Sequence, residues 1–349
     1  MDLATFWFIV IGVLWTGYLV LEGFDFGVGM LLPVLGGKRY ASDAVDAEKR
    51  RRVLLNTIGP VWDGNEVWVL TAGGATFAAF PNWYATLFSG FYLPLLLILV
   101  ALIVRNLGFE YRHKRPEARW KARWDQAIFW GSLVPALLWG VALTNIVRGV
   151  PIDAAKEYTG NLFTLLNPAG LLGGLVFVAL FLTHGAIFVA LKTDGKIRLE
   201  ARQIAERVGV VAAVLAVALL LWIGLTDGKP ASWITTVVAA VALLGGLAAN
   251  RAGREGWAFI GTAVTIAMAV ATYFLVLFPD VMPSSTNPAW SLTIHNASST
   301  DYTLKVMTVV ALVFTPIVLI YQGWTYWVFR KRLTVKHIPE DAPLETVSH

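Results

Sequence analysis

The sequence predicts an all-α integral membrane protein with nine transmembrane helices. Hydrophobic residues make up 57% of the 349 residues and charged residues only 15%, against about 25% charged residues in soluble domains. Nine apolar stretches have the length of a membrane span, and the basic residues gather in alternate connections between them. Lipid offers no hydrogen-bond partners to the backbone, so each stretch is expected to be a helix.

The spans are predicted, in chain order, at residues 6–35, 53–80, 83–104, 126–147, 169–191, 208–224, 233–249, 257–278 and 305–329. The first is long enough to be tilted, bent or broken, and its flexible points are Gly23, Gly27 and Gly29. Prolines within other spans should kink their helices; these are Pro60, Pro94, Pro135 and Pro316. Residues 1–329 are thus predicted to form a single polytopic membrane domain, followed by a polar tail, 330–349.

The distribution of Lys and Arg predicts the orientation. All but four of these 28 residues lie in connections 36–52, 105–125, 192–207 and 250–256 or in the tail; the exceptions are Arg148, Lys156, Lys229 and Lys305. Cytoplasmic loops carry such an excess, so we expect the N-terminus outside and the C-terminus in the cytoplasm. This bias explains the pI near 9.4 without a nucleic-acid partner, and membrane lipid is the expected surrounding. The absence of Cys excludes disulfides and iron–sulfur clusters.

Four acidic residues fall within the first two spans. Glu22 and Asp25 lie in the first and Asp63 and Glu66 in the second, whereas every Lys and Arg is assigned to a connection or a span edge. Ionisable residues in lipid are costly and point to function. Asp25 and Asp63 each lie about 15 Å from the cytoplasmic end of their span, at a helical rise of about 1.5 Å per residue. On neighbouring antiparallel helices, these two carboxyls could face each other.

Glu22 and Glu66 lie one turn deeper than Asp25 and Asp63, which predicts a ladder of four carboxyls. Without basic neighbours, burial and like-charge repulsion favour the protonated form of some of them, so that protons can bind and leave near neutral pH. The predicted role is a proton pathway, and no catalytic residue is assigned in this chain. Two alternatives stay open. The same oxygens could hold a cation, or the acids could bond nearby polar groups and merely lock two helices together; those groups are Asn56, Thr57, Trp62, Asn65 and Trp68.

Among the five His residues, only His184 lies within a predicted span. Haem held by two side chains needs a second well-placed ligand, and only sparse candidates exist: Met30, Met268 and Met307. We therefore expect a chain that binds no haem itself, in which His184 makes a hydrogen-bonded contact between helices.

Two sequence strings indicate a family. They are GFDFGVG at 23–29 and GPVWDGNEVW at 59–68. In this order, near the N-terminus of a chain with nine predicted spans, they closely resemble subunit II of the cytochrome bd quinol oxidases. The resemblance covers essentially the whole chain in length and span number, and its specificity rests on the first two spans.

The resemblance implies a heterodimer of the bacterial cytoplasmic membrane, sometimes with a small single-span subunit, that oxidises quinol and reduces dioxygen to water. In this family haem b, haem d and the quinol-oxidising loop belong to subunit I, which subunit II would stabilise. The fold of subunit II is similar to that of subunit I, with two four-helix bundles plus one extra helix, and subunit II can hold a structural quinone. Asp25 and Asp63 match the motifs and would line a proton path towards haem in the partner, while geometry adds Glu22 and Glu66.

A proton- or sodium-coupled secondary transporter is the main alternative, because broken helices with acids at the middle of the membrane are typical of that class. Transporters usually repeat such elements in an inverted second half, and the later spans hold no second acidic pair. The sequence therefore favours the oxidase subunit. A scaffold subunit without a proton role is the third interpretation.

Overall fold

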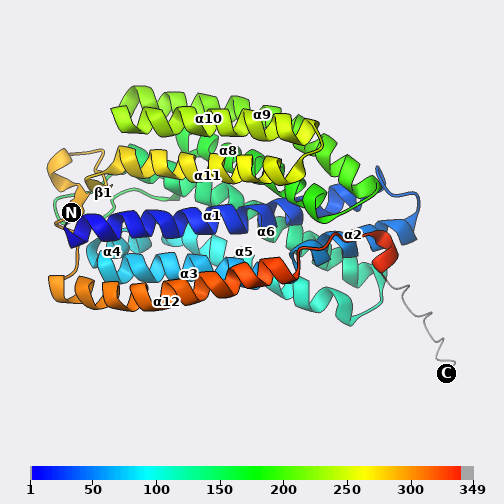
Figure 1. Ribbon diagram of the computed structural model, residues 1–349. Helices are drawn as coiled ribbons and strands as arrows, with labels where there is room; N and C mark the ends of the chain where they lie inside the picture. The colour runs from blue at the N-terminus through cyan, green and yellow to red at the C-terminus, as the bar shows by residue number, and fades with distance from the viewer. Residues whose placement is uncertain (1, 339–349) are drawn as a thin grey trace.

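The long helices run side by side in the computed structural model, which describes residues 2–338 (Figure 1). The first group of four packed helices comprises α1 (Leu3–Leu35), α3 (Trp62–Ala79), α5 (Tyr92–Tyr111) and α6 (Ala118–Arg148). The second comprises α8 (Pro168–Lys192), α9 (Lys196–Asp227), α10 (Pro230–Arg251) and α11 (Glu255–Leu277). The groups meet where α8 packs on α1 and α6, and α12 (Asp301–Val328) lies beside α1 and α3. The predicted all-α class is confirmed.

Short elements connect the long helices. The helical ones are α2 (Ala44–Ile58), α4 (Pro81–Gly90), α7 (Leu162–Leu165), η1 (Arg112–Lys114), η2 (Pro288–Trp290) and η3 (Val335–His337). Strands β1 (Asp280–Met282) and β2 (Leu292–Thr293) pair antiparallel, with Asp280 opposite Thr293. This small ribbon lies at the end of the molecule that also holds the N-terminus (Figure 1).

Eight helices in the described part of the chain are long and apolar enough to cross a membrane: α1, α5, α6, α8, α9, α10, α11 and α12. The predicted second span, 53–80, is divided, since α2 ends at Ile58 and α3 begins at Trp62. Pro60, which has no backbone N–H to donate, lies in the break between the two helices. Because the first turns of α3 are polar, this 18-residue helix is not among the eight. The nine-span count remains a prediction.

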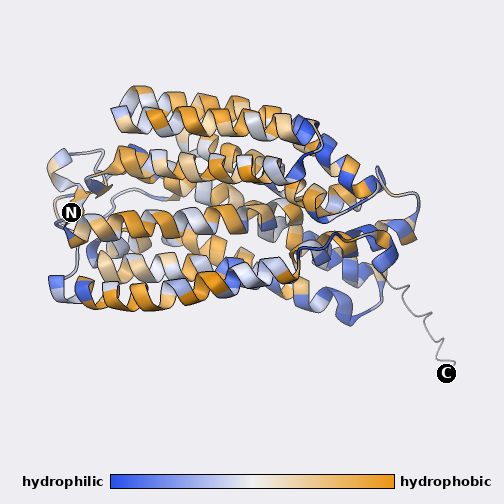
Figure 2. Cartoon of the chain, in the orientation of Figure 1, coloured by the Kyte–Doolittle hydropathy of each residue, from blue (hydrophilic) through white to orange (hydrophobic). Residues whose placement is uncertain are grey.

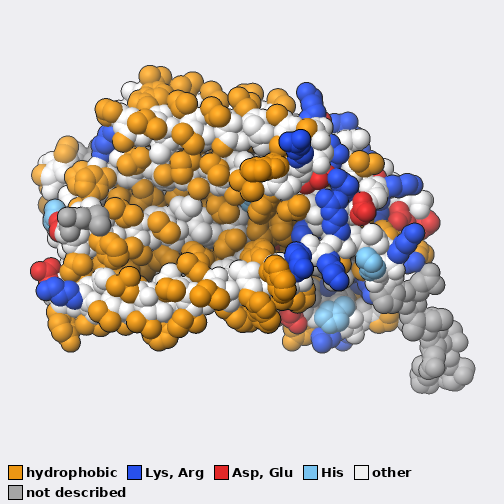
Figure 3. Space-filling view, in the orientation of Figure 1, with side chains coloured by type: hydrophobic (Ala, Val, Ile, Leu, Met, Phe, Trp, Pro, Cys, Tyr) orange, Lys and Arg blue, Asp and Glu red, His pale blue; other side chains and the backbone are white. Residues whose placement is uncertain are grey.

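Polar and apolar residues are segregated along the helix axes. Hydrophobic residues cover the long helices over most of their length, and hydrophilic residues concentrate around α2 (Figure 2). Lys and Arg side chains gather at that same end on the face shown in Figure 3. We call it the basic end; α1 reaches it at Leu35 and α12 at Val328. The side of the membrane that it faces remains a prediction.

Close helix crossings enclose the middle of the molecule. A Cβ added to Gly185 of α8 would lie 2.6 Å from Cα of Gly27 on α1, and one added to Gly140 of α6 would lie 2.7 Å from Cα of Gly174 on α8. Only glycine allows the backbones to come this near. Every residue of α1 from Glu22 to Leu32 is consequently buried.

Candidate functional site

The half of α1 nearer the basic end carries two buried acidic side chains. Glu22 and Asp25 are both 0% exposed. They lie three residues apart and therefore on nearly the same face of the helix. Since α3, α6, α8 and α11 pack around α1, these carboxyls depend on protein groups or internal water for polar contacts.

Arg105 of α5 forms an ion pair with Glu22 and is itself 0% exposed. Its guanidinium carbon also lies 4.8 Å from the ring centre of Phe26 and 5.3 Å from that of Phe109, within the range of cation–π attraction. The prediction that the buried acids have no basic neighbour is thus wrong. The helix continues past the predicted end of the span at residue 104 to Tyr111, which places Arg105 nearly two turns inside it.

Asn65 of α3, rather than Asp63, is the direct neighbour of Asp25. Its Nδ2 donates a hydrogen bond to Oδ2 of Asp25 over 2.7 Å, and Asn65 is 0% exposed. Asp63 instead lies on the exposed face of α3. The prediction that Asp25 and Asp63 face each other is therefore wrong. Asp63 and Asn65 lie two residues apart on α3, which begins at Trp62, so their side chains point about 200° away from each other.

Glu66 is partly buried and accepts a hydrogen bond from Nδ2 of Asn106 over 2.9 Å. Asn106 follows Arg105 on α5. Glu22, Asp25 and Glu66 all interact electrostatically with the Arg105 guanidinium. We call these three acids, together with Arg105, the carboxyl cluster.

Sequence reasoning overlooked Arg105 and Asn106, and it considered Asn65 only as a group that might lock helices. A signal for Arg105 was present, because no Pro or Gly separates it from the apolar run that begins after Pro94. A helix in progress normally continues until such a residue. The partner of Arg105 lies 83 positions earlier in the chain, beyond the reach of any local pattern.

Two adjoining cavities lead along α3 and α12. One of 690 Å³ lies between α12 and the pair α1 and α3; its polar wall includes Asp63, Asn65, Gln322 and Tyr326. The other, of 310 Å³, lies at the basic end and is lined in part by Lys192, Arg330 and Arg332. Pro60, Val61 and Tyr326 belong to the walls of both cavities. The space at the basic end therefore adjoins the space that contains Asp63.

His184 is buried between three helices. Its Nδ1 lies 2.6 Å from the hydroxyl of Thr262 on α11, and its Nε2 lies 3.2 Å from the carbonyl oxygen of Val20 on α1. The ring stacks on Phe259, with 4.6 Å between ring centres. Both ring nitrogens thus have partners, as a helix contact requires. Within residues 2–338, no group of three or more His, Cys, Asp or Glu residues is arranged to hold a metal ion.

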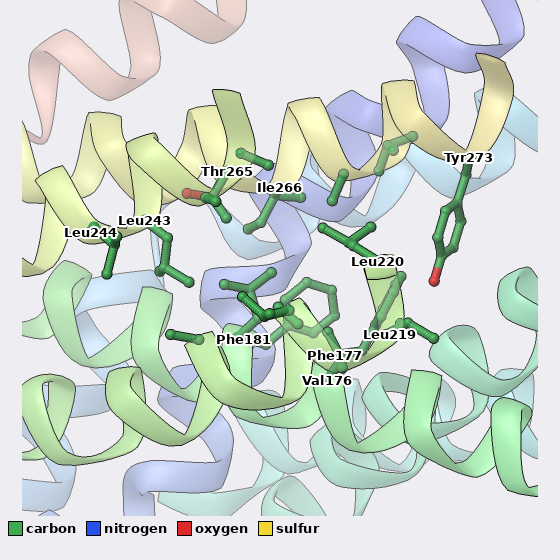
Figure 4. A pocket seen from close by; sticks show the side chains of 18 residues that line it. Val176, Phe177, Phe181, Leu219, Leu220, Leu243, Leu244, Thr265, Ile266 and Tyr273 are labelled. Carbon is green, nitrogen blue, oxygen red and sulfur yellow. The ribbon is translucent and has the colours of Figure 1, made fainter. Parts of the chain in front are cut away.

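Two apolar cavities share no lining residue with the carboxyl cluster. Leu, Val and Phe side chains surround one of 90 Å³ within the second helix group, with Tyr273 at one end (Figure 4). Another of 80 Å³ lies in the first group, where aromatic side chains including Trp15, Trp83 and Trp139 line it. Nε1 of Trp83 is buried and has no hydrogen-bond partner in the described part of the chain. An apolar ligand with a carbonyl group could accept that hydrogen bond.

Comparisons with known proteins agree over almost the whole chain. Residues 3–329 match the family model described as cytochrome bd terminal oxidase subunit II. The chain is 43% identical over 340 residues to the cytochrome bd ubiquinol oxidase subunit 2 of Bacillus subtilis, covering 96% of this chain and 98% of that relative. It is 38% identical over 370 residues to the cytochrome bd-I ubiquinol oxidase subunit 2 of Escherichia coli K12, covering 95% of each. A chain of the Geobacillus thermodenitrificans bd oxidase structure has a similar fold, with TM-score 0.76, 18% identity and coverage of 95% of this chain and 100% of that one.

Proposed function

Because the chain belongs to the cytochrome bd terminal oxidase subunit II family, we propose that it conducts protons from the basic end of its helices to oxygen reduction in a partner subunit. As a subunit of an oxygen-reducing quinol oxidase, it works in a reaction that consumes protons. The family assignment replaces the transporter considered from the sequence. The proposed location is the bacterial cytoplasmic membrane, with the basic end in the cytoplasm.

The observation that carries this proposal is the charge balance of the carboxyl cluster. Glu22, Asp25 and Glu66 share one guanidinium, that of Arg105. Full ionisation would leave two uncompensated negative charges in a buried region, which is costly. The cluster is neutral when two of its carboxyls carry protons. From this state the cluster can accept or release one proton while its net charge stays within one unit of neutrality. Arg105 already supplies the positive charge that a bound cation would bring, which favours protons over the cation alternative.

The proposed path begins at the basic end. Water in the 310 Å³ cavity would bring protons past Tyr326 to Asp63, which lies on the wall of the adjoining cavity. Glu66 is one turn further along α3, and the cluster then continues to Asp25 and Glu22 on α1. Carboxyl groups and internal water are the usual carriers in such relays.

The partner is proposed to cover the face formed by α3 and α12. Only 6% of the apolar window of α12 is buried within this chain, and Asp63 is exposed beside it. An exposed carboxylate is costly against lipid, so this face is better suited to a protein neighbour. Subunit I, which would be stabilised by this contact, is the expected partner; a small single-span subunit and membrane lipid are further expected contacts.

The side chains present fit a quinone better than a haem. His184 uses both ring nitrogens in contacts with Thr262 and Val20, so it is unsuited to be an axial ligand. Haem b and haem d, with the quinol donor, are therefore proposed to bind subunit I. The indole N–H of Trp83, buried without a hydrogen-bond partner in the described part of the chain, could donate to a carbonyl oxygen of a structural quinone, which would contribute stability rather than chemistry.

The test replaces Asp25 by Asn in the complete oxidase. We expect Asp25→Asn to lower the rate of oxygen consumption at least about tenfold, since a proton carrier is lost, while the haem spectrum is retained. Glu117→Gln, at the exposed N-terminal end of α6, is the matched control and should leave the rate unchanged. An unchanged rate in Asp25→Asn would overturn the proposal, as would a rate loss fully explained by missing haem.

A further inference from the structure

Asp25 receives a hydrogen bond from a chain of side chains that reaches to α12. Nε1 of Trp68 donates to Oε1 of Gln322 over 2.9 Å, and Nε2 of Gln322 donates to Oδ1 of Asn65 over 3.3 Å. Nδ2 of Asn65 then donates to Oδ2 of Asp25. The chain crosses from α3 to α12 and back before it reaches α1.

The direction of every bond in this chain is fixed by its first member. The indole nitrogen of Trp68 can only donate, so the Gln322 amide must turn its oxygen towards Trp68 and its NH₂ group towards Asn65. The hydroxyl of Tyr326 donates to the same Asn65 oxygen over 2.7 Å. With two donors on its oxygen, the Asn65 amide must present its own NH₂ group to Asp25.

The two oxygens of Asp25 therefore differ. Oδ2 accepts the Asn65 hydrogen bond, whereas Oδ1 is buried and has no hydrogen-bond partner in the described part of the chain. A flipped Asn65 amide would place its carbonyl oxygen against the carboxylate, which is repulsive. The neighbouring charged or titratable groups are Glu22 on α1, Glu66 on α3, Arg105 on α5 and Tyr326 on α12.

We propose that Trp68, Gln322 and Asn65 are positioning residues that hold an N–H donor on Oδ2 of Asp25 and leave Oδ1 as the oxygen that accepts and releases the transferred proton. This inference rests on the proposed proton pathway. In the step itself, the carboxylate gains one proton at Oδ1 to become a carboxylic acid and returns to a carboxylate when the proton leaves. Oδ2 is then the carbonyl oxygen of the protonated form.

The row of hydrogen-bonded side chains also links Asp25 to α12, because Gln322 lies on that helix. α12 has few contacts with α1 and α3, and its described polar contacts with them lie at two places. One is the Trp7 indole, which donates to Leu304 and Thr308; the other is the set of bonds around Asn65. A shift of α12 would therefore break the Gln322 and Tyr326 hydrogen bonds that orient the Asn65 amide.

The experiment measures the infrared C=O stretching band of protonated Asp25 in the complete oxidase, identified as the band that Asp25→Asn removes. Loss of a hydrogen bond to a carbonyl oxygen raises its stretching frequency. We expect Asn65→Leu to raise the band most, and Gln322→Met and Trp68→Phe to raise it in the same direction by less. Turnover should fall about tenfold in Asn65→Leu and by smaller factors in the other two, as expected for a displaced reacting group.

Matched controls lie elsewhere on the chain. Gln126→Met on the exposed face of α6 and Trp257→Phe, at an exposed position near the start of α11, should leave both band and turnover unchanged. The inference is overturned if Trp68→Phe and Gln322→Met leave the band where it is while Asp25→Asn still slows turnover. Unchanged turnover in Asp25→Asn would instead refute the pathway itself. Should Asn65→Leu fail to assemble, the two variants more distant from Asp25 still decide.

Discussion

Replacement of Arg105 by Met should destabilise the protein severely. Met is also long and unbranched but carries no charge, so Glu22 stays buried without its partner. Removing one member of a buried ion pair costs about 3–5 kcal/mol, and losing the contacts with Phe26 and Phe109 adds about 0.5–1 kcal/mol each. The expected loss of about 4–7 kcal/mol is comparable with the whole free energy of unfolding of many proteins, about 5–15 kcal/mol.

A second substitution, Glu22→Gln, removes the other charge of this ion pair. In Arg105→Met combined with Glu22→Gln, no carboxylate remains unpaired at this position, so most of the lost free energy should return. The difference in free energy of unfolding between Arg105→Met and the unaltered protein should also shrink as the pH falls, because a protonated Glu22 needs no counter-ion. These two results separate an electrostatic cost from a simple packing defect.

The assay is unfolding of the purified oxidase in detergent, followed by tryptophan fluorescence as temperature or denaturant rises. Arg119→Met, at an exposed position in the first turn of α6, is the control and should change the free energy of unfolding by less than about 0.5 kcal/mol. The reasoning fails if Arg105→Met behaves like Arg119→Met. It also fails if the double variant is no more stable than Arg105→Met alone.

Three further predictions concern packing, cofactor content and orientation. Gly27→Leu should prevent assembly, because any side chain at Gly27 would collide with the α8 backbone at Gly185, whereas Gly256→Leu, where a Cβ meets open space, should assemble; native gel electrophoresis distinguishes them. The chain expressed without its partner should show no haem Soret band, and a stoichiometric haem spectrum would contradict the assignment of haem to subunit I. A reporter fused after His349 should be active in the cytoplasm, and labelling from the outside would refute the predicted orientation.

The sequence predicted the helical membrane class and the acidic nature of the buried site, because both depend on residue type within short stretches. Glu22 and Asp25 are indeed buried on one face of α1. It failed where the result depends on helix phase. The restart of α3 at Trp62 rotates Asp63 outwards and Asn65 inwards, and a continuous span from residue 53 could not indicate this.

Hydropathy also failed for Arg105, for a different reason. Such an average treats each charge as an isolated cost, so a span is expected to end before the first Arg. A charge that is paired can lie deeper, and Glu22 on another helix supplies the pair. The packing that brings α1 and α5 into this contact is a tertiary property of the whole fold.

The most direct test of the proton pathway is the rate of proton uptake during a single turnover. Oxidase reconstituted in liposomes is reduced and mixed with oxygen, and a pH-sensitive dye reports protons taken up from the side of the basic end. For Asp25→Asn we expect oxygen binding to the reduced haems to keep its rate while proton uptake slows at least about tenfold. Proton uptake at the unaltered rate in Asp25→Asn would contradict the account.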